Sequence, residues 1–188
     1  MMFRITALVL VAWLVQGCAA AVLAGGATAV TSAGDPRTLG SQIDDKTIVL
    51  RASKALDQDP VTKKTGNINI TSYNGIVLLT GQVPNNGVRE QAAELVRVDG
   101  VRDVHNQIRV GSEVTFGTAS QDAWITTRVK TKFLADEAVN AMNIKIVTEN
   151  GEVFLMGLVS EEEANKAVNL ARNVDGVARV IKAFEYKQ

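Results

Sequence analysis

The sequence feature that most constrains the fold is an internal duplication. The first copy contains N-I-N-I at 67–70, Asn74-Gly75 and V-D-G-V at 98–101, and the second contains N-I-K-I at 143–146, Asn150-Gly151 and V-D-G-V at 174–177. The offset between the copies is 76 residues from residue 67 onward and 77 residues in the preceding segment. Because a duplicated sequence folds into a repeated unit, the 188 residues should form two similar domains with modest cores.

Within each copy, local patterns predict the order helix, strand, strand, helix, strand. The first helices are expected at 45–56 and 123–134, with Asp44 and Asp122 as N-caps. Each Asn-Gly pair lies between alternating apolar runs, which predicts a type I′ hairpin. Second helices at 87–97 and 161–173 and last strands at 101–110 and 177–186 complete the order. This αββαβ pattern predicts an α+β fold in which two helices cover one face of a three-stranded sheet.

The N-terminus has the pattern of an export signal. Residues 1–17 carry one cation, Arg4, and an apolar run that is too short for a comfortable transmembrane span. The run L-V-Q-G-C resembles a bacterial lipobox, which implies cleavage before Cys18 and lipidation of its thiol. Ala19 in place of aspartate implies sorting to the outer membrane. An ordinary signal peptide is the weaker alternative, because the single cysteine of the chain falls at this position.

Residues 18–42 are small, apolar and glycine-rich at their start, and they are expected to form a flexible lipidated leader. The following residues resemble the BON domain in the glycines Gly81, Gly100, Gly157 and Gly176 and in the V-D-G-V-x-x-V tail. The resemblance implies tandem BON domains at 43–111 and 121–188, joined by a linker at 112–120. A lipobox followed by two BON domains resembles the dual BON-domain outer-membrane lipoproteins.

That resemblance implies a non-enzymatic protein on the periplasmic face of the outer membrane. It further implies a role in outer-membrane integrity, recruitment to division sites, and binding of anionic phospholipid, such as phosphatidylglycerol, through the second domain.

The first helix of each copy has one side that is expected to face the core. The two copies differ on the opposite side of this helix. With Trp124 set at 0°, Arg128 falls at about 40°, Thr131 at about 340° and Leu134 at about 280°. Trp124 replaces Thr47, Leu134 replaces Asp57, and Thr131 replaces Lys54, whereas Arg128 matches Arg51. The second copy therefore presents an apolar, cation-flanked face where the first is polar. The predicted phospholipid site consists of Trp124, Arg128, Lys130, Thr131, Leu134 and Leu158.

The hairpins differ in a similar way. The face shared by both copies, Val77, Leu79 and Val83 in the first and Val153, Leu155 and Val159 in the second, is assigned to the core. The alternate face carries Leu78, Thr80 and Gln82 in the first copy but Phe154, Met156 and Leu158 in the second. An exposed apolar set is therefore expected in the second copy alone. Phe154 and Met156 are assigned to packing, and Leu158 is added to the lipid site.

Two other readings of these apolar residues stay open. They could pack the second domain against the first, or they could bind a protein, because an apolar patch marks an interface without naming its partner. A periplasmic adaptor for envelope-assembly or cell-wall machinery is therefore the alternative function.

Composition argues against other classes. The chain has 20 basic and 20 acidic residues, so no basic field favours nucleic acid. With one cysteine and one histidine, no metal or cofactor site is expected. His105 matches Ile181 and is expected to be a half-exposed strand residue, and Glu161–Glu163 suit a helix N-terminus. We expect a monomer without enzymatic activity.

Overall fold

The structure is a computed structural model that describes residues 38–65, 67–112 and 115–187. The predicted signal peptide, Cys18 and most of the predicted leader lie outside these residues. The first domain comprises α2 (Leu39–Gln58), α3 (Thr62–Thr65), β1 (Asn67–Tyr73), β2 (Ile76–Val83), α4 (Asn86–Leu95), β3 (Asp103–Asn106) and β4 (Arg109–Val110). The second comprises α5 (Phe116–Leu134), the 3₁₀ turn η2 (Ala141–Asn143), β5 (Ile144–Glu149), β6 (Glu152–Val159), α6 (Glu161–Arg172) and β7 (Arg179–Tyr186).

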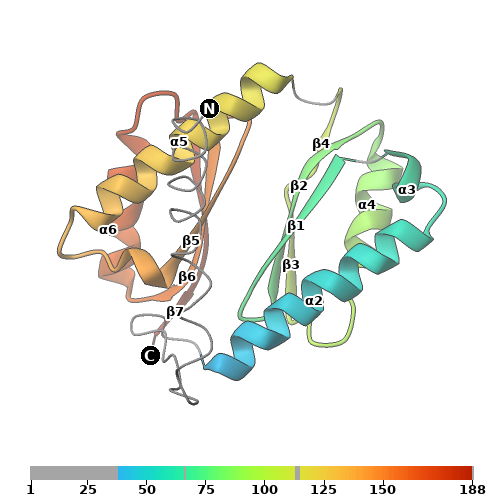
Figure 1. The fold of residues 1–188 in the computed structure, drawn as a ribbon, viewed down its shortest axis with the longest axis horizontal. Helices are drawn as coiled ribbons and strands as arrows, with labels where there is room; N and C mark the ends of the chain where they lie inside the picture. The colour runs from blue at the N-terminus through green and yellow to red at the C-terminus, as the bar shows by residue number, and fades with distance from the viewer. Residues whose placement is uncertain (1–37, 66, 113–114, 188) are drawn as a thin grey trace, which may run out of the picture. The chain divides into compact units, whose positions relative to one another are not determined.

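The two domains share one topology, as the duplication predicts. In each sheet the second hairpin strand is central: β2 pairs antiparallel with β1 and parallel with β3, and β6 pairs antiparallel with β5 and parallel with β7. Helices α2 and α4 lie on one face of the first sheet, and α5 and α6 lie on one face of the second (Figure 1). The predicted αββαβ fold with two helices on one face of a sheet is confirmed.

The last strand of the first domain is interrupted, which the sequence pattern did not predict. Its two parts, β3 and β4, both pair with β2. The Asn106 side chain accepts a hydrogen bond from the Ile108 backbone N–H at 3.2 Å and donates one to the Arg89 carbonyl at 2.9 Å. These bonds hold the break between the two short strands.

The first helix of each domain begins well before its predicted start, and the predicted N-caps are wrong. Thr38 caps α2, because its hydroxyl accepts the Ser41 N–H at 3.1 Å, and Thr115 caps α5 by accepting the Thr118 N–H at 3.3 Å. The end of the predicted leader and the end of the predicted linker are therefore helical.

Asp122, a predicted cap, and Asp45, the neighbour of the other predicted cap Asp44, are buried and bind the hairpins. Asp45 accepts the backbone N–H groups of Asn74 and Gly75 at 2.8 and 2.9 Å. Asp122 accepts those of Asn150 and Gly151, both at 2.8 Å. The Asn and Gly residues of both turns have φ values between 52° and 77°, which confirms the predicted type I′ hairpins. Successive N–H groups in this conformation form a concave anion site, so each carboxylate fastens a helix to its own hairpin.

The recurrent strand glycines are explained by the close approach of neighbouring backbone. A Cβ at Gly81 would lie 1.8 Å from the Asn67 carbonyl oxygen, and one at Gly157 would lie 2.4 Å from the Asn143 carbonyl oxygen. Gly81 also has a φ of +116°, which side chains rarely adopt. The glycines therefore permit pairing between the two hairpin strands.

Each domain has its own apolar core between its sheet and its helices. The strand residues predicted to face the core are confirmed: Val77, Leu79 and Val83 in the first domain, and Val153, Leu155 and Val159 in the second. The helices contribute Ile48, Ala52 and Leu56 from α2, and Ile125, Val129 and Phe133 from α5.

A third apolar cluster lies between the two sheets. The two domains belong to one compact unit of the chain, and this cluster joins Tyr73, Ile76 and Leu78 to Phe154, Met156 and Ala183. The prediction that the second hairpin alone exposes an apolar set is wrong, because β2 and β6 are buried on both faces. The assignment of Phe154 and Met156 to packing is confirmed.

Polar contacts surround the cluster between the sheets. The Tyr73 hydroxyl donates to the Asn143 carbonyl at 3.0 Å. Arg102 forms an ion pair with Glu185 at 2.8 Å, and Arg109 forms one with Glu152 at 2.7 Å. Glu152 is buried, so its pairing matters more than that of a surface carboxylate. The sheets are therefore joined by an apolar centre with paired charges at its margin.

Candidate functional site

Helix α5 has a buried stripe and an exposed apolar face. Asp122, Ile125, Val129 and Phe133 are buried. On the other side, Trp124 is 45% exposed and Leu134 is 64% exposed, and Phe116 at the start of the helix is 88% exposed. Two of the residues predicted for the lipid site, Trp124 and Leu134, therefore face solvent and are not packed against the first domain.

The exposed face of α5 has apolar side chains along its middle and basic side chains on both sides. With Trp124 at 0°, Phe116 and Leu134 both fall at about 280°, and the direction opposite the buried stripe is about 320°. Arg128, at about 40°, and Lys130, at about 240°, flank that direction on its two sides. The acidic residue of this helix is Asp122, which is buried and bound to the hairpin. The exposed face therefore combines apolar side chains with flanking cations and carries no carboxylate.

The polar side chains of α5 differ in how they are held. The Arg128 guanidinium carbon lies 4.9 Å from the centre of the Trp124 ring, in a cation–π contact. Lys130 is exposed. The Thr131 hydroxyl donates to the Thr127 carbonyl at 2.9 Å, within the helix. Lys132 donates to the Asn173 carbonyl at 2.7 Å, at the C-terminus of α6, so it is committed to the fold.

A groove of about 210 Å³ runs beside Trp124, between α5 and the loop that follows α6. It is lined by Trp124, Arg128, Thr131, Lys132, Asn173, Val174 and Asp175. Two basic side chains and one acidic side chain thus line the same groove next to the exposed indole. This groove is too small for a whole phospholipid but is of a size to admit part of a headgroup.

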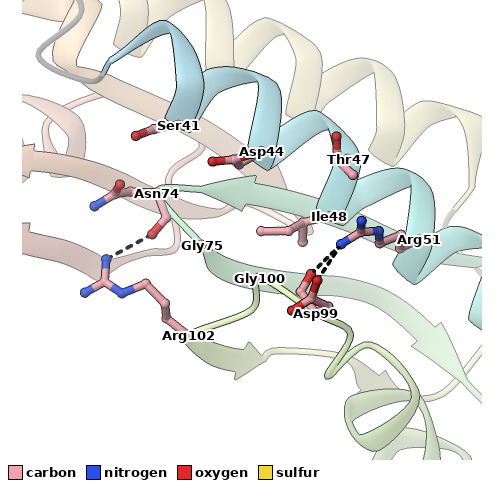
Figure 2. A pocket seen from close by; sticks show the side chains of 10 residues that line it. All are labelled: Ser41, Asp44, Thr47, Ile48, Arg51, Asn74, Gly75, Asp99, Gly100 and Arg102. Carbon is pink, nitrogen blue, oxygen red and sulfur yellow. Dashed lines mark hydrogen bonds and ion pairs between the residues drawn. The ribbon is translucent and has the colours of Figure 1, made fainter.

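The first domain has a corresponding pocket of about 410 Å³, shown in Figure 2. There Thr47 stands at the position of Trp124, and Arg51 points toward Asp99. The Arg51 Nη1 atom donates to the Asp99 carbonyl at 3.1 Å and lies 3.2 Å from its carboxylate. The matching arginines of the two domains therefore have different partners, a carboxylate in the first and an indole in the second.

Two exposed apolar residues near the site were not predicted. Phe116 could have been predicted from the sequence. The segments T-L-G-S at 38–41 and T-F-G-T at 115–118 extend the repeat and align Phe116 with Leu39. Met142 is exposed in η2, which contacts α5, and it matches Gly66 in the first copy. Both enlarge the apolar surface of the second domain.

Leu158 lies apart from the other predicted site residues. It is half-buried and packs against the apolar cluster between the two sheets, so the structure does not bring it to the exposed face of α5. The first domain is also less polar than expected, because Leu39, Ile43 and Leu50 are exposed on α2. Cys18, the predicted lipidation site, lies outside the described residues.

The titratable residues that were considered for catalytic or metal-binding roles lie in secondary structure elements or turns. His105 is half-buried in β3, with its Nε2 atom 3.8 Å from the Asp103 carboxylate. Glu161, Glu162 and Glu163 lie in the first turn of α6, behind the N-cap Ser160. Hydrogen bonds hold the pKa of Asp59 below its usual value, and the bond donated by the Thr62 backbone N–H contributes most. The same bonds fix the turn before α3.

Within residues 38–65, 67–112 and 115–187, no helix combines the length and apolar character that a membrane crossing requires. In the same residues, histidine, cysteine and carboxylate side chains do not gather in a group that could hold a metal ion.

Comparison with known proteins places the chain in a family. A model of the BON domain matches residues 44–112 and 121–188. The chain is 46% identical to the outer membrane lipoprotein DolP of Haemophilus influenzae, over 91% of this chain and 89% of that protein. It is 44% identical to a 21 kDa hemolysin of Actinobacillus pleuropneumoniae, over 82% of this chain and 80% of that protein. It is 31% identical to the osmotically-inducible protein Y of Escherichia coli, over 76% and 72% of the two chains. The chain therefore belongs to the BON-domain family and carries two copies of that domain.

Proposed function

We propose that this protein is a non-enzymatic outer-membrane lipoprotein that binds anionic phospholipid through the exposed face of α5. Lipidated Cys18 anchors it to the periplasmic face of the membrane, where it supports membrane integrity and gathers at division sites. The observation that carries the proposal is the character of the α5 face. Phe116, Trp124 and Leu134 are exposed, Arg128 and Lys130 flank them, and the one acidic residue of the helix itself, Asp122, is buried. The similarity to an outer membrane lipoprotein supports the anchored location.

The geometry suits a helix that lies in the plane of the headgroups. Phe116 and Leu134 are separated by about 27 Å along the helix axis, at about 1.5 Å per residue. Trp124 stands between them, and an indole is favoured at the boundary between headgroups and acyl chains. Interfacial helices typically combine such an apolar face with cations at its borders. The three apolar side chains would therefore reach the membrane together.

The expected affinity of α5 alone is low, and the anchor compensates for this. Burial of each large apolar side chain contributes about 1.5–3 kcal/mol, and each cation near an anionic surface adds about 1 kcal/mol. The entropy lost when the protein associates with the membrane and its side chains become ordered offsets much of this favourable free energy. Attachment through Cys18 raises the effective lipid concentration toward the millimolar range, so that a weak surface becomes occupied.

Trp124→Glu tests the proposal directly. In the mature chain with Cys18→Ser, which cannot be acylated, this change should weaken binding to phosphatidylglycerol vesicles about 10- to 100-fold, because it removes an apolar contact and adds a repelled charge. Thr47→Glu, at the matching position of the first domain, should leave binding unchanged. Vesicle co-sedimentation measures both.

NMR provides the location of the contact in the same protein. Titration with phosphatidylglycerol micelles should shift resonances of residues 116–134, and zwitterionic micelles should shift them less. Shifts that persist in Trp124→Glu, or that map mainly to the first domain, would contradict the proposed surface.

A second candidate function, a periplasmic adaptor that binds an envelope protein, is favoured by the exposed aliphatic residues of α2. Leu39, Ile43 and Leu50 lie on one stripe of that helix. The helices of each domain cover the sheet face turned away from the cluster between the sheets. A membrane in contact with α5 therefore does not cover the α2 stripe.

Photo-crosslinking in cells tests the adaptor function. A crosslinking residue at Leu50 should capture an envelope-assembly or cell-wall protein, because this side chain is the most exposed of the stripe. The same residue at Arg97, an exposed position that follows α4, should not capture it. Crosslinking to lipid alone from Leu50 would exclude a protein partner at this surface.

A further inference from the structure

The matching arginines of the two domains offer an internal comparison, because the pockets that they line overlap at three equivalent positions. Both grooves are formed by the first helix and the V-D-G-V turn, and both are lined by an arginine and an aspartate at equivalent positions. In the first domain, Arg51 and Asp99 form an ion pair at 3.2 Å. In the second, the guanidinium carbon of Arg128 lies over the Trp124 ring, 4.9 Å from its centre. Three residues of α5 that line the groove beside Arg128 differ from their counterparts: Trp124 replaces Thr47, Thr131 replaces Lys54 and Lys132 replaces Ala55. Of these, the indole is the one in contact with the guanidinium.

The two arrangements leave different parts of the guanidinium available. The ion pair in the first domain uses in-plane N–H donors, because Arg51 bonds the carbonyl and carboxylate of Asp99 through Nη1. Stacking on a ring engages the flat face of a guanidinium and leaves its in-plane donors free. Those donors match phosphate oxygens in geometry and charge. An arginine held over the Trp124 ring, without a carboxylate partner among the described residues, is therefore better prepared to meet a phosphodiester than one paired with a carboxylate.

We propose that Trp124 determines headgroup specificity by holding Arg128 away from Asp175, so that the guanidinium binds the phosphate of an anionic lipid. This inference rests on the proposed phospholipid function and adds a role for the indole beyond its apolar contact. Trp124 acts on specificity as a positioning residue, and Arg128 makes the contact. Lys132 does not substitute for it, because its ammonium group is bound at the end of α6.

Trp124→Leu separates the two roles of the indole, because it keeps an apolar side chain but removes the ring. Arg128 should then pair with Asp175, as Arg51 pairs with Asp99. In the full mature chain with Cys18→Ser, the ratio of affinities for phosphatidylglycerol and phosphatidylcholine vesicles should fall about tenfold, the effect of one lost charge-assisted contact. The NMR resonance of the Arg128 Nε–H group should shift without any lipid.

Asp175→Asn provides the rescue. In the Trp124→Leu background it removes the competing carboxylate and should restore most of the phosphatidylglycerol preference. In the otherwise unchanged chain it should alter that preference less than about twofold, so the two changes are coupled. Asp99→Asn is the matched control, because it releases Arg51 in the first domain and should change neither affinity.

The outcomes distinguish this inference from the function on which it rests. If the unaltered chain does not bind phosphatidylglycerol vesicles through α5, both fail. If it binds them, but Trp124→Leu keeps the full lipid preference, the positioning role of the indole is overturned. A gain from Asp175→Asn that is equal in both backgrounds also overturns it, since that carboxylate would then repel lipid without capturing Arg128.

Discussion

Replacement of Gly81 by alanine should destabilise the first domain by at least about 3 kcal/mol, or more than about 10 °C in melting temperature. The new Cβ would lie 1.8 Å from the Asn67 carbonyl oxygen, where the two hairpin strands pair. It would also force a side chain into a backbone conformation with a φ of +116°. Relief of this clash requires separation of β1 from β2, the central strand of the sheet. Thermal and urea unfolding followed by circular dichroism measure the effect.

Gly111→Ala is the matched control for this change. A Cβ at Gly111 meets no atom within 4 Å, so the substitution should alter stability by less than about 0.5 kcal/mol. A loss below about 1 kcal/mol for Gly81→Ala would contradict the close backbone approach described for this hairpin.

Phe154→Ala should cost about 3–5 kcal/mol, the usual range for removal of a buried phenyl ring. Phe154 is 1% exposed and lies in the cluster between the sheets, against residues of the other domain. Its loss would leave a cavity there and weaken the attachment of the two domains. Urea unfolding measures the free-energy change, and faster hydrogen exchange of the amides of β2 and β6 would report the looser attachment.

Phe116→Ala is the control, because this ring is 88% exposed and its removal should change stability by less than about 0.5 kcal/mol. If both substitutions had equally small effects, the sheets would not pack against each other in solution through Phe154.

The core faces and hairpins were predictable because their patterns are local. Alternation along β2 and β6 separates Val77 and Val153 from their neighbours, and Asn-Gly pairs specify the turns. The packing of one sheet on the other was not predictable in this way. Thr80 and Gln82 look like solvent-facing residues in the sequence but are buried. Alternation shows which residues share a face and does not show what covers that face.

The candidate site was predicted in part for similar reasons. Comparison of the copies located Trp124 and Leu134, because a helix face follows from residue spacing. It misplaced Leu158, since a strand residue opposite the core can meet solvent or another sheet. The early helix starts, and with them Phe116, were missed because Asp44 and Asp122 were taken as caps. Asp122, and Asp45 beside the predicted cap of the first domain, instead bind turn N–H groups distant in sequence, which only the folded chain brings close.

The carboxylate of Asp122 has a consequence for the way α5 can meet a surface. Because that side chain fastens the helix to the second hairpin, and the buried stripe is committed to the core, α5 cannot roll or detach without breaking the domain. The helix is thus held rigidly in the domain, and only its outward-facing side chains can enter a surface that it contacts. Binding through α5 should therefore require little conformational change in the protein. A bilayer in contact with the helix would be contacted at its surface, and the interior of that bilayer would stay undisturbed.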